Sequence, residues 1–278
     1  MSKLESEGQI DDSKKILVPI GGHSSELKIC NLLLGLAKTK KHKLTFLHVK
    51  TPEVKADKVL NELKRNIKRE GVDAQIKIIH GEDVAYEILK EAKRRYSLIA
   101  MASRLKVLKE EIFGSVVNKV VRNARCNALV FHNANKLPKS LNNILVPLLS
   151  PNRKAIRLVL EFTNIECCKE ADITFLHIHE LPITLPMGTE YIPEENKTET
   201  REVLFIVKEE SKIAGKTPWI KNIFTRDAKK TLLEYVKRVK PDLIFLPAQK
   251  KPRAIFGLLG TDEYYLASRL NLPIIFFF

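Results

Sequence analysis

The amino-acid sequence contains one pattern twice. Four segments of the first half recur in the same order in the second half: KILVPI at 15–20 as NILVPL at 143–148, LTFLHVK at 44–50 as ITFLHIH at 173–179, SLIAMAS at 97–103 as DLIFLPA at 242–248, and IFGSVVNKVVRNARCNALVF at 112–131 as LLGTDEYYLASRLNLPIIFF at 258–277. The offset is 128 and 129 for the first two pairs and 145 and 146 for the last two, which indicates an insertion in the second copy. Its natural place is the stretch 181–199, which contains three prolines and a glycine. We therefore predict two domains, 1–135 and 136–278, with a polar linker at 132–143.

In each copy, short apolar runs alternate with segments in which apolar residues recur at helical spacing. The first copy predicts strands at 15–20, 43–50, 74–80, 97–102 and 128–132, and helices at 24–40, 53–70, 83–95 and 114–125. The second copy predicts strands at 143–149, 172–179, 219–225, 242–247 and 273–277, and helices at 152–168, about 198–213, 227–239 and 260–270. Strands separated by helices form right-handed crossovers, so we predict an α/β fold of two tandem, doubly wound, five-stranded parallel-sheet domains.

Sheets of this kind bind ligands beyond the carboxyl ends of their strands, near the point where the strand order reverses. The loops expected to form such a site are 20–25, 50–53 and 102–115 in the first copy, and 148–153, 179–198 and 247–261 in the second. Helix starts are predicted at Ser24 or Ser25, either of which can cap the helix with Glu26 in its first turn.

The net charge is strongly positive, +15, because 48 lysines and arginines face 33 aspartates and glutamates. Such a charge suits a nucleic-acid or anionic-membrane partner. The basic residues are nevertheless spread through helical segments such as 38–43, 90–95 and 229–238, which is typical of solvated helix faces. This spread does not favour nucleic-acid binding. Hydrophobic residues make up 44% of the chain, enough to bury a core in each half, so we expect a folded protein.

No apolar run approaches the roughly 18 residues that span a bilayer, and residues 1–15 lack the apolar stretch of a signal peptide. We therefore expect a soluble, cytoplasmic protein with no membrane span. The four cysteines form no C-x-x-C pair, and adjacent Cys167 and Cys168 are poorly placed for a disulfide, so reduced thiols are expected.

The first copy contains an opening I-L-V-P, a second strand ending F-L-H-V, a fourth strand L-I-A-M-A-S-R, a G-S-V-V-N-K-V-V helix start and a final C-N-A-L-V-F. In these residues the sequence resembles the universal stress protein family, and the resemblance covers nearly the whole chain, twice. The resemblance implies a tandem member with the adenine nucleotide alpha hydrolase-like fold, and pairing of the two halves through their last strands. Pairing would also cover the C-terminal FFF, which as a free strand edge would invite aggregation. We thus expect an intramolecular pseudo-dimer; whether two chains associate further stays open.

Family members that bind ATP carry a G-2x-G-9x-G(S/T) pattern after the fourth strand and an aspartate after the first. This sequence departs from that pattern in both copies. Ala102 and Leu105 replace the first two glycines of copy one and Pro247 and Lys250 those of copy two, whereas Gly114–Ser115 and Gly260–Thr261 are kept. Gly21 and Leu149 stand at the acid position. Side chains where the backbone would approach phosphate obstruct it, so we expect ATP or AMP binding to be weak or absent.

The candidate ligand-binding residues lie at the strand ends and loops of both copies: Pro19, Ile20, Gly21, Val49, Met101, Ala102, Arg104, Gly114, Ser115, Val116, Pro147, Leu148, Pro247, Lys250, Gly260 and Thr261. Arg104 and Lys250 could supply charge toward a phosphate or another small anion. Gly114–Ser115 and Gly260–Thr261 open helices, whose N-termini attract anions, but Ser115 and Thr261 also fit simple N-capping. Replacement of Gly114 by valine is expected to strain the helix entry.

The histidines give a weaker signal. His48 and its counterpart His177 are expected to be satisfied core residues of the second strands. His177 and His179 share one face of a strand, but zinc would need two further ligands that no spacing signals, so no metal is predicted. His23 is expected in solvent, near a ligand.

No nucleophile motif or P-loop is present, so no catalytic residue is predicted. The sequence favours a tandem universal-stress-like binding and regulatory module with degenerate nucleotide motifs over an enzyme. Two alternatives stay open: a weak ATP- or AMP-binding protein with slow ATPase activity, and a basic nucleic-acid-associated protein.

Overall fold

The computed structural model describes residues 15–52, 56–103, 113–148, 152–181, 194–248 and 266–278. The first half forms β1 (Lys15–Pro19), α1 (Glu26–Lys40), β2 (Lys43–Lys50), α2 (Asp57–Glu70), β3 (Ala74–His80), α3 (Val84–Ala92), β4 (Leu98–Ala102), α4 (Ser115–Asn123) and β5 (Asn127–His132). After the short 3-10 turn η1 (Ala134–Lys136), the second half forms β6 (Asn143–Leu148), α5 (Arg153–Phe162), η2 (Glu166–Cys168), β7 (Asp172–Glu180), α6 (Glu194–Ala214), β8 (Trp219–Thr225), α7 (Ala228–Val239), β9 (Leu243–Pro247) and β10 (Ile274–Phe277). The predicted α/β alternation is confirmed.

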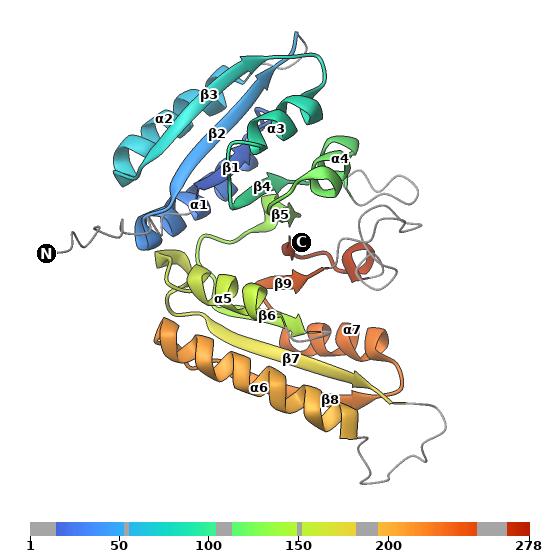
Figure 1. The fold of residues 1–278 in the computed structure, drawn as a ribbon. Helices are drawn as coiled ribbons and strands as arrows, with labels where there is room; N and C mark the ends of the chain where they lie inside the picture. Colours follow the sequence, from blue (N-terminus) through green and yellow to red (C-terminus); the bar gives the residue numbers. More distant parts are fainter. Residues whose placement is uncertain (1–14, 53–55, 104–112, 149–151, 182–193, 249–265) are drawn as a thin grey trace, which may run out of the picture.

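All ten strands lie in one continuous sheet, in the order β3-β2-β1-β4-β5-β10-β9-β6-β7-β8 (Figure 1). Within each half the neighbouring strands are parallel, and the strand order of one half mirrors that of the other. The two halves meet where β5 and β10 pair antiparallel, with Phe131 opposite Ile275. Ala128 and Phe278 exchange backbone hydrogen bonds of 2.9 Å in both directions, which extends this pairing to the last residue.

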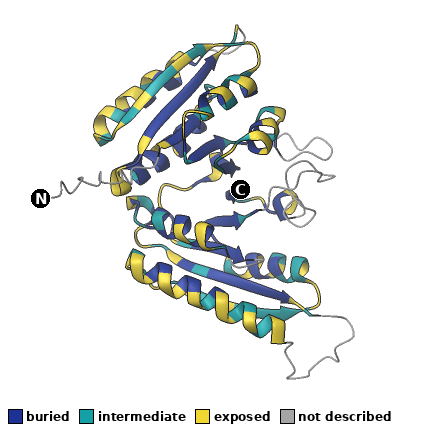
Figure 2. Ribbon diagram, viewed as in Figure 1, coloured by how far each residue is buried: buried dark blue, intermediate teal, exposed yellow. Residues whose placement is uncertain are grey.

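The core is divided by sheet face and not by half. Alternate residues of each strand point to opposite faces, and α1, α2, α5 and α6 cover one face while α3, α4 and α7 cover the other. Each half buries apolar residues on both faces of the sheet, and each of the two apolar layers is continuous through both halves. Figure 2 shows the central strands fully buried and the outer strands β3 and β8 half-exposed. No helix among the described residues is both long and apolar enough to cross a membrane.

The segment 132–143, predicted as a polar linker, is anchored to the body of the protein. Leu137 and Leu141 are buried. The Lys28 ammonium on α1 donates hydrogen bonds to the carbonyl oxygens of Asn135 and Leu137, at 2.7 and 2.8 Å. The connection between the halves is therefore held in place, as expected for two units that share one sheet.

Several element boundaries differ from the prediction for local reasons. α5 ends at Phe162, not near 168, because the side chains of Thr163 and Asn164 both donate to the carbonyl of Leu160, at 2.7 and 3.3 Å. α6 begins at Glu194, so the last part of the predicted 181–199 insertion is helical, and 182–193 lies outside the described residues. Of the predicted 260–270 helix, 266–269 are described and helical.

Two glycines beside helices differ sharply in what they require. Gly71 ends α2 in the left-handed region with φ 64°, where a side chain is strained. Gly114 precedes α4 with φ −63° and ψ 160°, an ordinary extended conformation, and an added Cβ would meet no atom of the described residues within 4 Å. The expectation that Gly114→Val would strain the helix entry is therefore wrong.

We expect Gly71→Ala to lower the free energy of unfolding by about 1–2 kcal/mol, because alanine pays the left-handed penalty that glycine avoids. The matched variant Gly114→Ser should stay within about 0.5 kcal/mol of wild type, since serine there can cap the helix. Urea unfolding of both variants checks this. An equal loss for both would contradict the backbone assignment.

His132 gives the junction between the halves a pH dependence. Its ring lies in the β5–β10 seam, 1% exposed and edge-on to Phe276 with ring centroids 6.2 Å apart. Neither ring nitrogen has a hydrogen-bond partner among the described residues. Burial, with a smaller effect of the Lys136 charge, lowers the pKa of His132 to about 4. The unfolded chain, with a pKa near 6.5, therefore binds the proton first as the pH falls.

The contribution of His132 to stability should thus be fully present above about pH 6.5 and be lost between about pH 6.5 and 4, a change of up to roughly 3 kcal/mol. His132→Leu should flatten this dependence by about one proton. Urea unfolding at a series of pH values measures it, with His80→Leu, which removes an exposed histidine of β3, as control. An unchanged slope in His132→Leu would show that this histidine is protonated in the folded protein.

Candidate functional site

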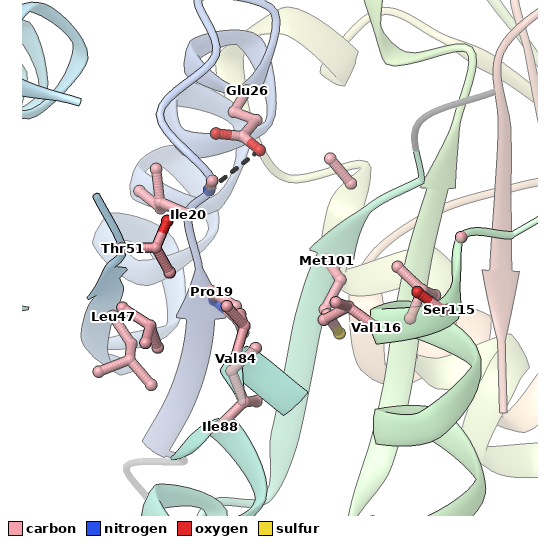
Figure 3. A pocket seen from close by; sticks show the side chains of 15 residues that line it. Pro19, Ile20, Glu26, Leu47, Thr51, Val84, Ile88, Met101, Ser115 and Val116 are labelled. Atoms are coloured by element: carbon pink, nitrogen blue, oxygen red, sulfur yellow. Dashed lines mark hydrogen bonds between the residues drawn. The ribbon is translucent and has the colours of Figure 1, made fainter. Parts of the chain in front are cut away.

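A cavity of about 280 Å³ opens at the carboxyl ends of β1, β2 and β4, between α3 and α4 (Figure 3). Every described candidate residue of the first copy lines it: Pro19, Ile20, Gly21, Val49, Met101, Ala102, Gly114, Ser115 and Val116. Arg104 lies outside the described residues. The structure therefore brings together, in one place, strand ends and a helix start that lie up to about a hundred positions apart in the sequence.

The walls of this cavity are mostly apolar. The predicted Val49 and Met101 come from β2 and β4, and sequence reasoning missed Leu47 of β2 and Val84 and Ile88 of α3. Val84 and Ile88 lie one helical turn apart on the inner side of α3, so their apolar spacing was a signal for packing but not for a ligand. An apolar cavity with few polar groups is typical of a small-molecule site.

The loop that follows β1 holds the buried carboxylate of Glu26. Its Oε1 accepts a hydrogen bond from the Gly21 amide at 3.1 Å, and its Oε2 accepts from the Gly22 and His23 amides at 3.0 and 3.1 Å. Glu26 is 7% exposed and lines the cavity (Figure 3). Three successive amides around one carboxylate form an anion nest that the protein fills with its own side chain.

Glu26 changes the interpretation of the missing acid at position 21. The sequence places glycine there, but the structure returns a carboxylate to the same loop from the first residue of α1. Ser25 is the N-cap residue of α1, as predicted, yet its side chain makes no capping hydrogen bond. Glu26 was predicted only as a first-turn acid that suits the helix dipole, so its reach back to the loop could not be read from spacing alone.

Gly114 and Ser115 are positioned by contacts on both sides. Phe113 packs edge-on against Phe276 of β10, with ring centroids 5.2 Å apart. The Asn118 side-chain amide donates to the Phe113 carbonyl at 2.8 Å. The N-cap of α4 is Gly114 and Ser115 is its first helical residue, so N-capping by the Ser115 side chain, one of the two readings of this pair, is not observed.

The two helices that wall the cavity are tied together by one aspartate. Asp83 caps α3 by accepting from the Tyr86 amide at 2.9 Å, and it also accepts from the Lys119 ammonium of α4 at 2.6 Å. The hydrogen bond from Lys119, and after it the bond from Tyr86, lowers the pKa of the Asp83 carboxyl. This ion pair therefore connects α3 to α4 at the protein surface.

In the second half, the described candidate residues lie at the corresponding strand ends. Pro147 and Leu148 end β6, and Pro247 ends β9. Lys250, Gly260 and Thr261 lie outside the described residues, as does the insertion 182–193.

The paired histidines have different environments. His48 is buried and its Nδ1 lies 2.9 Å from the Ile20 carbonyl, which confirms the expected satisfied core residue. His177 is equally buried, but it lies beside His179 and Glu199, a group whose ligand atoms are within 4.8 Å of one another. Sequence spacing could not place Glu199 there, because α6 begins earlier than predicted. His23 is exposed, and its backbone amide is bound by Glu26.

Residues 50–132 match the family model of the Universal stress protein family. No curated protein matches the chain. Among solved structures, a universal stress protein from Archaeoglobus fulgidus DSM 4304 is 19% identical, with a TM-score of 0.63 over 95% of this chain and 98% of that one. A putative universal stress protein from Pseudomonas aeruginosa UCBPP-PA14 is 16% identical, with a TM-score of 0.58 over 95% and 92%.

The cytoplasmic domain of a prokaryotic cation chloride cotransporter is also similar, 12% identical with a TM-score of 0.57 over 95% of both chains. At these identities the solved structures show a shared fold and nothing of function. The family match covers β3 to β5 and includes Met101, Ala102 and the Gly114–Ser115 pair of the cavity. The family match thus lies in the first half of the chain, over residues 50–132, and the solved structures show that the whole chain shares the fold of universal stress proteins.

Glu26→Ala should lower the free energy of unfolding by roughly 1–3 kcal/mol, because the three loop amides lose the carboxylate that accepts their hydrogen bonds. Glu209→Ala, which removes an exposed carboxylate of α6 and changes the net charge equally, should have little effect. Chemical denaturation of both variants at one pH measures the difference. Equal stability of the two variants would show that water replaces the carboxylate without cost.

Proposed function

We propose that the chain is a tandem universal-stress-type regulatory module whose first-half cavity binds the adenosine part of a nucleotide. The observation that carries this proposal is the cavity itself: apolar walls from β2, α3 and β4 end at a carboxylate, Glu26, beside the loop after β1. A flat base fits between apolar side chains such as Val49 and Met101. Ribose hydroxyls can donate hydrogen bonds to a carboxylate.

The same geometry disfavours a triphosphate. Glu26 places a negative charge in the loop amides that would otherwise attract an anion. Ala102 lines the cavity at the position where the family pattern has its first glycine, and its Cβ keeps the backbone away from phosphate. We therefore expect adenosine or AMP to bind better than ATP.

Binding without efficient catalysis follows from the lining. Among the described residues that line the cavity, Glu26 is the one ionisable side chain, and its two oxygens face three backbone amides. A hydrolase would need a base placed toward a water nucleophile and a group that holds a metal near phosphate. Slow ATPase activity is for this reason the weaker candidate.

The antiparallel β5–β10 pairing supports a second part of the proposal, that two universal-stress-type domains, 1–135 and 136–278, form a pseudo-dimer within one chain. The mirrored strand order of the halves is what a fused dimer would show.

The positive charge gives less support to a nucleic-acid interface. Described basic residues lie on helices of both sheet faces, for example Lys38 on α1 and Lys237 on α7. A nucleic-acid footprint requires a contiguous basic surface. Spread over two opposite faces, the charge of +15 serves solubility.

Calorimetric titration of adenosine, AMP and ATP with Mg²⁺ tests the proposed ligand. We expect AMP to bind at least about tenfold more tightly than ATP, a difference of about 1.4 kcal/mol. Val116→Trp should abolish binding, because Val116 is half-buried on α4 and its enlarged side chain would fill the cavity. Val239→Trp, at a half-buried position of α7, is the matched control and should bind normally.

Tighter binding of ATP than of AMP would show that the phosphate grip survives and would contradict the role given to Glu26. No heat with any of the three, confirmed by equilibrium dialysis, would contradict an adenosine ligand altogether.

A further inference from the structure

A second site is built into the other half and on the opposite face of the sheet. His177 and His179 lie at the carboxyl end of β7, two residues apart and therefore on one face, which α6 covers. Glu199, on the first turns of α6, points into the same place: its Oε1 is 3.8 Å from His177 Nε2. α6 runs alongside β7 and β8 in Figure 1.

We propose that His177, His179 and Glu199 bind a divalent transition-metal ion of the Zn²⁺ type. Two imidazoles and one carboxylate are a donor set that zinc prefers. One ligand atom from each residue lies within 4.8 Å of the others. Ligands about 2.0–2.1 Å from zinc lie about 3.3 Å apart, so modest side-chain rotations would complete the site.

Unsatisfied buried atoms mark this place as a site. His177 Nδ1 and Asn222 Oδ1 are buried and meet no partner with good hydrogen-bond geometry among the described residues, although the Asn222 side chain adjoins both histidine rings. Asn222 belongs to β8 and lies opposite His177 in the strand register. Buried polar atoms are nearly always bonded. A water bound to a metal ion here could donate a hydrogen bond to the Asn222 Oδ1 atom. Packing of the histidine rings alone would give that oxygen no well-aligned donor.

The partners of His179 resemble the outer shell of a metal site. Its Nε2 lies 2.9 Å from Thr200 Oγ1, and the Thr200 hydroxyl donates its single hydrogen to the Asn196 carbonyl at 2.8 Å. Thr200 must then accept from His179 Nε2, which leaves the lone pair on Nδ1. Metal-binding histidines donate their other ring N–H in this manner. The Nδ1 contact to the Asn196 amide, 3.4 Å long, is weak enough to be exchanged.

The histidine side chains are shielded from water, since His177 and His179 are 1% and 2% exposed. A cation bound there would offset the cost of placing the Glu199 carboxylate beside them.

The described residues of the first half form no such group, so that half provides a control. The position of His177 corresponds to His48, whose Nδ1 is bound to the Ile20 carbonyl, and that of His179 corresponds to Lys50. An ion held by β7 and α6 would tie together two elements whose ligands, His179 and Glu199, lie twenty residues apart. The site thus goes beyond the nucleotide cavity, and its metal would stabilise one half selectively.

The test is metal binding by the full chain, as purified and after removal of metal. The adjacent thiols of Cys167 and Cys168, with sulfurs 3.5 Å apart, could also bind zinc, so the double variant Cys167→Ser/Cys168→Ser is titrated in parallel. We expect one equivalent of Zn²⁺ in that variant, a higher Tm with zinc, and a Co²⁺ spectrum with no thiolate band. Mg²⁺, which prefers oxygen ligands, should not compete.

In the same cysteine-free background, His177→Gln/His179→Gln should lose the bound ion and the zinc-dependent rise in Tm, whereas His48→Gln should retain both. Glu199→Gln, at a less buried position, tests the site should the double histidine variant fail to fold. Thr200→Val should weaken binding by about 10- to 100-fold, because the ring of His179 loses its outer partner.

Two results would overturn the proposal. One is no zinc bound by the cysteine-free variant, and the other is an unchanged affinity in Glu199→Gln and in His177→Gln/His179→Gln.

Discussion

The pairing of β5 with β10 is the interaction on which the rest of the structure depends. It joins two sets of five parallel strands into one sheet, and it covers a C-terminal strand made almost wholly of large apolar residues. Phe276 and Phe278 reach across the seam to Phe113, which directly precedes the Gly114–Ser115 pair of the cavity. The second half therefore contributes contacts that position part of the ligand site of the first.

Much of this fold could be predicted from the sequence, because its strongest signals are periodic. Buried parallel strands appear as short apolar runs, and strands such as 43–50, 74–80 and 219–225 were located to the residue. Helix ends set by side-chain chemistry were less predictable. The end of α5 depends on Thr163 and Asn164 bonding back to Leu160, and the start of α6 lies within a stretch rich in proline and charge.

The residues of the candidate site also fall into a predictable and an unpredictable group. Residues at strand ends, such as Met101 and Ala102, follow from topology, since the carboxyl ends of parallel strands meet at one edge. Glu26 and Glu199 do not, because each acts through a side chain that crosses from a helix to a loop or strand. The sequence shows where a helix lies but not which of its exposed-looking acids turns inward. Glu26 belongs to the proposed ligand cavity, and Glu199 belongs to the proposed metal site.

The central claim is that an adenosine-type ligand enters the cavity beside Glu26. Methyl and amide NMR of the full chain with adenosine tests it most directly. We expect the shifts to concentrate on the Met101, Val49 and Val116 methyl groups and on the Gly21 amide, and to saturate together. Shifts confined to the second half, or none at all in a saturating excess of adenosine, would contradict it.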